Sequence, residues 1–222
     1  MASFYQLKFI SCDKMANGYY VFNFEKPKGF EFLEGQFGVF SHVNRSVEGK
    51  PTRAFSIASG KNENTIKIGV KIIESPSDFK KKMLEMIPGD FMSFRGPVGK
   101  FTLEEDHDSV LIAAGIGITP IRSLLLQMKD IEYSGAVDLI YSEGKECYPF
   151  KDEIDGMSFL KKHYLSTPEQ TISTIKSVSD DYHKHTFYYV CGSPGFVKAI
   201  KVVLTENDVP YDHIKYDPFT GY

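Results

Sequence analysis

The sequence lacks several features that would each indicate a class of protein. It has no tryptophan and only three cysteines, Cys12, Cys147 and Cys191. These cysteines are too far apart for a zinc finger, and three thiols cannot hold an iron–sulfur cluster of the four-cysteine type. We therefore expect no bound metal.

Long apolar runs and an excess of positive charge are also missing. Nowhere do about 18 apolar residues follow one another, so we expect no membrane span. Lysine and arginine total 26 against 29 for aspartate and glutamate, a formal charge of -3, which disfavours a nucleic-acid-binding protein. The first residues do not resemble a signal peptide. Together with the odd number of cysteines, this indicates a cytoplasmic location.

The first half of the chain has the pattern of short strands. Residues 65–72 (TIKIGVKI) alternate polar and apolar side chains, as a half-buried strand does. Residues 19–25 and 37–42 are aromatic and β-branched and also predict strands. One helix is predicted over residues 78–87, with Ser77 as its N-cap. Many short strands at close spacing favour a barrel or a sandwich.

The second half alternates strands with helices. Continuous apolar runs at residues 109–114, 136–141 and 187–191 predict strands that are covered on both faces. Amphipathic helices are predicted over residues 120–131 and 194–206. This alternation is typical of a parallel α/β sheet.

A glycine turn, residues 115–120 (GIGITP), connects the first of these strands to the first of these helices. Its glycines let the backbone approach a pyrophosphate, and the N-terminus of the helix supplies N–H groups and the positive end of a dipole. Pro120 fits the first helical turn, where its missing N–H costs nothing. A plain strand-to-helix turn is the alternative, since one glycine motif is a weak signal.

Two further segments carry candidate chemistry. In residues 53–56 (RAFS), Arg53 can pair with a phosphate, Phe55 can stack on a flat ring, and Ser56 can hydrogen-bond a ring nitrogen. Taken alone, this segment is equally a strand with one surface arginine. Cys191 ends a buried strand and is followed by Gly192, at the kind of edge where parallel sheets bind ligands.

These segments, taken in order, resemble the ferredoxin–NADP reductase superfamily. The likeness runs through GQF (residues 35–37), RAFS (53–56), GPVGKF (96–101), GIGITP (115–120), CGSP (191–194) and the FTGY tail (219–222). It implies an N-terminal antiparallel β-barrel that binds FAD (residues 1–103). A C-terminal α/β parallel-sheet domain that binds NAD(P) (residues 104–222) would follow, and hydride would pass between nicotinamide C4 and flavin N5.

The resemblance assigns FAD contacts motif by motif. Arg53 would bind the pyrophosphate, Phe55 would stack on the flavin in place of the family's usual tyrosine, and Ser56 would lie beside flavin N5. Ser77, at the start of the predicted helix, would make the second phosphate contact, and Ser75 is the alternative residue for this role. The complete predicted set is Arg53, Ala54, Phe55, Ser56, Val70, Ser75, Ser77, Phe219 and Tyr222.

The same resemblance assigns the nicotinamide site. Cys191 would lie near the nicotinamide, and Phe219 or Tyr222 would cover the other face of the flavin and yield to the nicotinamide. The predicted catalytic residues are accordingly Ser56, Cys191 and Tyr222. The predicted NAD(P) contacts are Gly115, Gly117, Thr119, Pro120, Ser142, Glu143, Lys145, Cys191 and Gly192.

The choice between NADH and NADPH depends on the loop after the second α/β strand. Glu143 suits the two ribose hydroxyls of NADH and repels a 2′-phosphate, whereas Ser142 and Lys145 suit NADPH. Because the loop contains no arginine, we expect NADH to be preferred.

The resemblance implies a separate electron acceptor: a ferredoxin- or flavodoxin-like protein, an oxygenase component, or a small acceptor such as free flavin or a ferric chelate. A non-catalytic flavin- or nucleotide-binding subunit of a larger redox assembly is the alternative. A plain dehydrogenase is disfavoured because it would have no use for the strand-rich first half.

Overall fold

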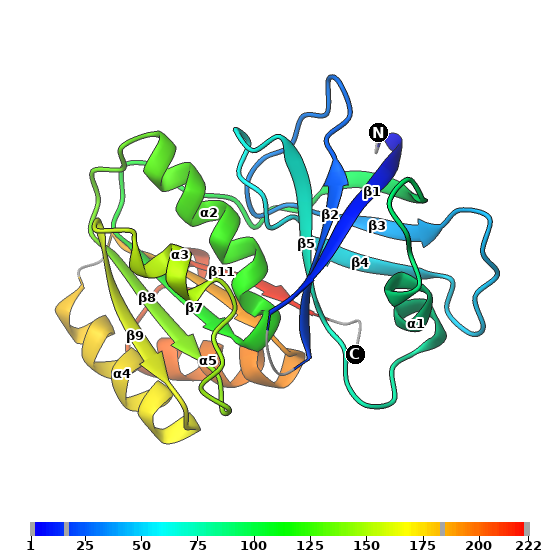
Figure 1. Ribbon diagram of the computed structural model, residues 1–222. Coiled ribbons are helices and arrows are strands. Elements are labelled where there is room, and N and C mark those ends of the chain that lie inside the picture. Colours follow the sequence, from blue (N-terminus) through cyan, green and yellow to red (C-terminus); the bar gives the residue numbers. More distant parts are fainter. Residues whose placement is uncertain (1–2, 16–17, 183–184, 220–222) are drawn as a thin grey trace. The chain divides into compact units, whose positions relative to one another are not determined.

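The computed structural model describes residues 3–15, 18–182 and 185–219 (Figure 1). The chain divides into two compact units, of which the first ends at Thr102 and the second begins at Leu103. Among the described residues, no helix has both the length and the apolar character needed to cross a membrane. Nor do three His, Cys, Asp or Glu side chains in those ranges gather as a metal site.

The first unit is an antiparallel barrel with one short helix, α1 (Asp78–Leu84). Its strands lie in the order β4-β3-β6-β1-β2-β5, and each is antiparallel to its neighbour. An isolated antiparallel bridge between Ile57 and Ile68 nearly closes the barrel. The predicted barrel is confirmed. Its strands are β1 (Phe4–Lys14), β2 (Tyr19–Glu25), β3 (Phe37–His42), β4 (Thr52–Ser56), β5 (Thr65–Lys71) and β6 (Phe91–Val98).

Phenylalanine fills the interior of this barrel. The rings of Phe40 and Phe94, both fully buried, meet edge to face with their centroids 5.1 Å apart. Gly38 makes room for this pair, because a Cβ at that position would lie 2.8 Å or less from atoms of the Phe94 ring. The alternation in β5 is also confirmed, since its apolar positions are buried.

The second unit is a parallel sheet of five strands in the order β11-β10-β7-β8-β9, as the fold prediction required. The strands are β7 (Ser109–Ala114), β8 (Val137–Ser142), β9 (Leu160–Leu165), β10 (Phe187–Gly192) and β11 (Ile214–Pro218). The helices are α2 (Ile118–Asp130), α3 (Lys151–Asp155), α4 (Pro168–Asp181) and α5 (Pro194–Glu206), with single 3₁₀ turns η1 (Gly115–Gly117) and η2 (Tyr211–His213).

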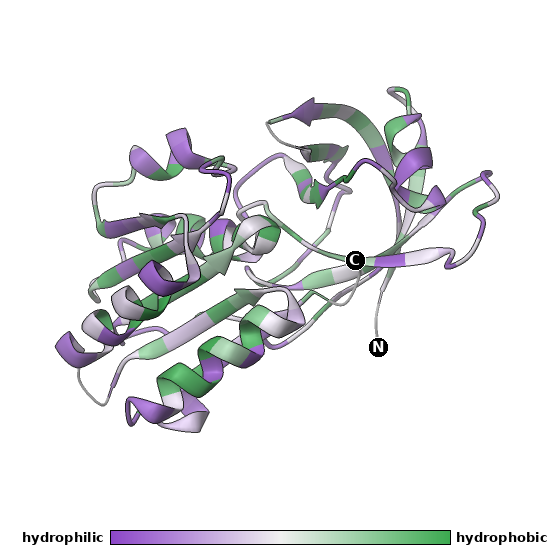
Figure 2. Ribbon diagram, turned by 90° about the horizontal axis from the view of Figure 1, so that it is seen from below, coloured by the Kyte–Doolittle hydropathy of each residue, from purple (hydrophilic) through white to green (hydrophobic). Residues whose placement is uncertain are grey.

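The path of the chain through this sheet creates a switch point. The chain begins at the central β7, moves outward through β8 to β9, and then returns to β10 on the other side of β7. Helices α4 and α5 pack against each other, with Asn207 Nδ2 donating to Ser179 Oγ at 2.8 Å. Hydrophobic and polar residues alternate along the helices, as expected for helices with one buried face (Figure 2). Ligands of such sheets bind beyond the carboxyl ends of the strands at the switch point, here those of β7 and β10.

Sequence patterns missed some elements and misjudged others. The predicted helix over residues 78–87 is wrong in its length, because α1 ends at Leu84 and a turn follows in which Asp90 Oδ2 accepts the Ile87 N–H at 3.0 Å. Strand β9 was not predicted. It carries two adjacent lysines, Lys161 and Lys162, as an edge strand often does, and this hides its alternation.

Candidate functional site

The first candidate site is an open seam in the barrel, where β4 and β5 face each other across unpaired edges. The strands are held together at one end, where Ile57 bridges Ile68 and the Ala58 N–H donates to Lys67 O at 2.8 Å. In the described chain, no pairing between β4 and β5 extends beyond that bridge. Because the bridge pairs Ile57 with Ile68 in an antiparallel arrangement, two residues back along β4 correspond to two residues forward along β5, which places Phe55 opposite Val70. Backbone groups along such a seam can reach a ligand between the strands.

The seam brings together most of the predicted FAD-binding residues of the barrel. Arg53 is half-buried, and its Nη1 donates to Lys50 O at 2.7 Å and to Thr52 O at 2.9 Å. The half-buried Phe55 ring lies 5.6 Å from the Phe40 ring, centroid to centroid. Ser56 and Val70 are buried, whereas Ala54, also in the predicted set, is exposed.

A second cation at the seam, Lys80 of α1, was not predicted. Its Nζ donates to Lys71 O at 2.8 Å, at the end of β5. Burial lowers the pKa of Lys80, and the nearby positive charge of Arg53 lowers it further. The guanidinium of Arg53 lies 5.3 Å from the centroid of the Phe79 ring, next to Lys80 in the sequence.

Neither cation is joined to a carboxylate by a salt bridge within the described residues. Two such cations suit a multiply charged anion such as a pyrophosphate, which would relieve their mutual repulsion. The only signal in the sequence was a run of lysines on a short helix, and most such runs are solvated.

Ser75 and Ser77 lie on the exposed segment between β5 and α1. Ser77 occupies the N-cap position of α1, as predicted, but its side chain accepts no hydrogen bond from the helix. The expected cap bond is therefore absent from the described contacts. The geometry does not favour either serine over the other as a phosphate contact.

The second candidate site is the turn from β7 into α2, in the second unit. Gly115 has a φ of +53°, and Gly115–Gly117 form one 3₁₀ turn that leads directly into the helix. Gly117 lies against the end of β10. A Cβ there would lie 2.7 Å from Cys191 C and 2.9 Å from Gly192 N, and it would overlap Cys191 O. Only glycine allows the turn to pack this tightly at the switch point.

The side chains that follow the turn fix its shape. Thr119 is buried, and its hydroxyl donates to Ile116 O at 2.7 Å, so it closes the turn from within. Pro120 is the third residue of α2, inside the first helical turn as predicted. No side chain caps α2. The Ile118 N–H donates within the 3₁₀ turn, and N–H groups later in the first turn of a helix are the kind that bind anions.

The end of β10 lies beside this turn. Cys191 is fully buried, and its Sγ donates to Asp217 O at 3.2 Å. Burial, reinforced by the charge of Asp217, raises the pKa of this thiol well above its usual range. The thiol is therefore neutral, so it is no nucleophile. Gly192 O accepts the Phe219 N–H at 2.8 Å, which fixes the start of the aromatic tail. The predicted Tyr222 lies outside the described residues.

The loop after β8 holds the residues predicted to select the nucleotide. The Glu143 side chain is buried, and its Oε1 accepts the Lys145 N–H at 3.3 Å. Ser142 Oγ accepts a hydrogen bond from Thr171 Oγ1 at 3.0 Å, while the side chain of Lys145 is exposed. The acidic and basic candidates are both present at this strand end, so the NADH preference stays a prediction.

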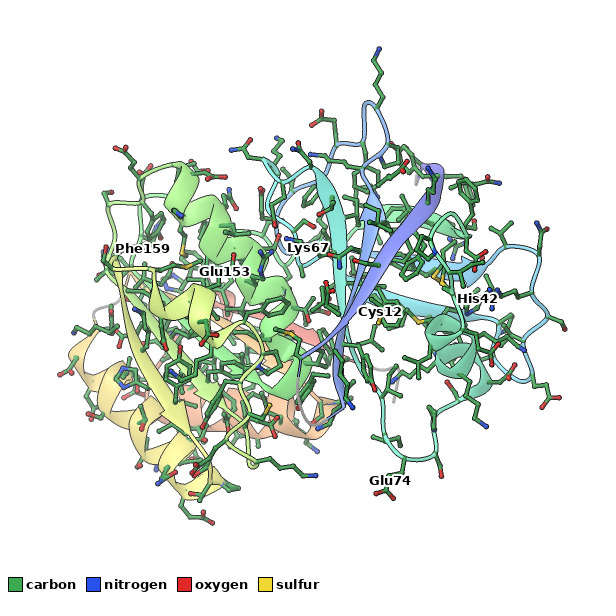
Figure 3. The ribbon with its side chains drawn as sticks, in the orientation of Figure 1. Cys12, His42, Lys67, Glu74, Glu153 and Phe159 are labelled. Carbon is green, nitrogen blue, oxygen red and sulfur yellow. The ribbon has the colours of Figure 1, made fainter. Side chains whose placement is uncertain are left out.

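An ion pair that the sequence did not reveal joins α2 to α3. The buried Arg122 donates from Nε and Nη2 to the two carboxylate oxygens of Glu153, each at 2.8 Å. Figure 3 labels Glu153 on α3. Its guanidinium also lies 5.1 Å from the centroid of the Phe150 ring. This forked pair holds α3 against the helix that begins at the glycine turn.

Comparison with known proteins agrees with this architecture, although no protein-family model matches the chain. The chain is 28% identical over 221 residues to the reductase component of propane 2-monooxygenase from Mycolicibacterium smegmatis, covering 88% of this chain and 61% of that protein. It is 26% identical to a flavohemoprotein from Bacillus thuringiensis, covering 85% of this chain and 53% of that protein. The chain thus spans a little over half the length of these curated relatives.

Solved structures show the same fold. A ferredoxin–NADP⁺ reductase from Neisseria gonorrhoeae with bound FAD and NADP superposes with a TM-score of 0.80 at 19% identity, covering 98% of this chain and 99% of that one. The chain has the two-domain fold of the ferredoxin–NADP reductase superfamily, and the resemblance drawn from its motifs is confirmed.

Proposed function

We propose that this chain is an FAD-dependent NAD(P)H oxidoreductase that passes electrons to a separate acceptor. Bound FAD would supply the redox chemistry, accepting hydride from the nicotinamide and releasing electrons to the acceptor. The protein's own part is to bind and orient the two cofactors and to exclude water. This explains why none of its candidate residues has to act as an acid or a base.

The observation that carries the proposal is the seam. It gathers a cationic pair, Arg53 and Lys80, a half-buried aromatic ring at Phe55, and the buried hydroxyl of Ser56 along unpaired strand edges. Each group matches one part of FAD chemically. The cations suit the pyrophosphate, the aromatic ring suits the isoalloxazine, and the polar groups suit the nitrogens of the isoalloxazine. The reductase relatives support the same assignment.

The deciding experiment is a visible absorption spectrum of the purified protein after FAD is supplied, followed by anaerobic titration with NADH and with NADPH. We expect a flavin band that bleaches with a nicotinamide. A protein that retains no flavin would refute the proposal. A flavin band that neither nucleotide bleaches would support the alternative, a flavin-binding subunit without reductase activity.

Arg53→Ala tests the phosphate role directly. The loss of one charge-assisted hydrogen bond costs about 1.5–3 kcal/mol, so FAD should bind roughly 10- to 150-fold more weakly. Arg95→Ala is the matched control, because Arg95 is exposed on β6 of the same unit. Equal FAD affinity in the two variants would remove Arg53 from the site.

Two finer points belong to the same proposal. We expect NADH to be used more efficiently than NADPH because of the acidic Glu143, and a higher kcat/KM with NADPH would overturn that preference. The acceptor is expected to be a small redox protein or an oxygenase component, as in the reductase relatives. Faster turnover with free flavin or a ferric chelate would instead favour the small-acceptor alternative.

A further inference from the structure

A cavity of about 500 Å³ opens at the amino-terminal end of the parallel sheet, the end opposite to the glycine turn. Its walls come from the end of α4, the start of β10, and the segment between α5 and β11. Its volume lies in the range of small-molecule sites. None of the predicted FAD or NAD(P) contacts lines it.

Two hydroxyl groups in this cavity have no protein partner among the described residues. Thr186 is only 2% exposed, and its buried Oγ1 makes no hydrogen bond. Tyr188, a residue 3% exposed, also lines the cavity, and no hydrogen bond joins its hydroxyl to another described residue, whereas Asn207 and His213 are paired. A buried hydroxyl without a partner is unfavourable, so the Thr186 hydroxyl in the cavity wall indicates a place for a hydrogen-bonding ligand.

The lining also restricts the chemistry of that ligand. The tyrosine rings of Tyr182 and Tyr188, together with Val209 and Pro210, form apolar and aromatic walls. Burial, with a contribution from the charge of Asp180, raises the pKa of Tyr188 to about 12, so its hydroxyl stays neutral and can donate. A buried ionic ligand would need a buried counter-charge, but the side chains of Asp208, His185 and His213 in the lining are exposed or half-buried.

We infer that this cavity is a binding site for a small, uncharged aromatic compound with a hydroxyl group, of the phenol class. The ring would pack against the tyrosine and proline walls, and its hydroxyl would pair with Thr186 and Tyr188. Because the cavity is at the other end of the sheet from the glycine turn, such a compound would not compete with the nicotinamide nucleotide. The inference is independent of the proposed redox function.

The test is a titration of the 222-residue chain with phenol, monitored by heteronuclear NMR and calorimetry. We expect saturable binding, with the shifts centred on Thr186, Asn207 and Val209. No saturable binding would overturn the inference, and so would shifts centred on Gly115–Gly117, because phenol would then occupy the nucleotide end of the sheet.

Two near-isosteric variants separate a built site from a chance cavity. Thr186→Val and Tyr188→Phe each remove one hydroxyl, and each should weaken phenol binding by about 2- to 12-fold, the value of one hydrogen bond. The matched controls, Thr205→Val and Tyr211→Phe, change exposed residues of the same unit and should leave phenol affinity unchanged. Unchanged affinity in both cavity variants would refute the assignment, and the second variant keeps the test valid if the first fails to fold.

Discussion

Gly117→Ala should destabilise the second unit, although alanine is the better helix former. Gly117 has a φ of -58°, which alanine adopts easily, and conformational entropy alone would favour the change by about 0.4–1 kcal/mol. The new Cβ, however, would lie 2.7 Å from Cys191 C, whereas ordinary contacts begin at 3.4 Å. Since these are backbone atoms of a central strand, no side-chain rotation can relieve the overlap.

The size of the effect follows from this balance. Overpacking of a rigid interior costs about 1–3 kcal/mol, which exceeds the entropic gain. We therefore expect a net loss of about 1–2 kcal/mol, or a fall in Tm of roughly 4–8 °C for a unit of this size. The displaced turn should also weaken nucleotide binding.

Gly195→Ala is the matched control, because a Cβ at that position in the first turn of α5 meets nothing within 4 Å. That variant should be neutral or slightly more stable than the parent. The assay is urea unfolding monitored by far-UV circular dichroism, with the affinities for NADH and NADPH measured in parallel. If the two alanine variants were equally stable, the close approach of the turn to β10 would be refuted.

Three other expectations follow from the described contacts. Lys80→Ala should weaken FAD retention by roughly tenfold without changing nucleotide affinity, and an unchanged Kd for FAD would remove this lysine from the seam site. Glu153→Ala should lower the unfolding free energy by about 1–3 kcal/mol because it removes the carboxylate that faces the buried Arg122. Glu25→Ala, which breaks an exposed pair, should cost less than about 1 kcal/mol in the same denaturation assay. Burial raises the pKa of the Cys191 thiol in the folded state, so the thiol's contribution to stability is complete below its unfolded pKa of about 8.5 and declines above it. Between pH 7.5 and 9.5 the parent should therefore lose more unfolding free energy than Cys191→Ala. Parallel pH profiles of the two proteins would contradict this.

Much of the architecture could be predicted from local pattern. Alternation in β5, apolar runs in β7 and β10, and the glycine turn before α2 all rely on interactions between residues close in sequence or on simple periodicity. What failed depended on tertiary context. Strand β9 has the lysines of an edge strand, and nothing nearby in sequence says that β8 will pair with it.

The candidate sites divide in the same way. Arg53, Phe55 and the glycine turn could be proposed from the sequence because short motifs contain their chemistry. Lys80 and the Arg122–Glu153 pair were missed because the interactions that single them out join residues far apart in the sequence. Lys80 lies near Arg53, and Arg122 pairs with Glu153. The unpaired hydroxyl of Thr186 could not be found at all, since burial without a partner is visible only after folding.

The seam between β4 and β5 has a consequence for the life of the protein in the cell. Because a single bridge joins the barrel there, that side of the barrel is weakly stabilised. Under the proposed function, the bound flavin would fill the gap between β4 and β5 and supply the missing contacts. A ligand at 100 times its Kd adds about 2.7 kcal/mol to the stability of the state that binds it. Newly made chains without flavin would then open more often and be cleared sooner by proteases, so flavin supply would help to set how much of this protein accumulates.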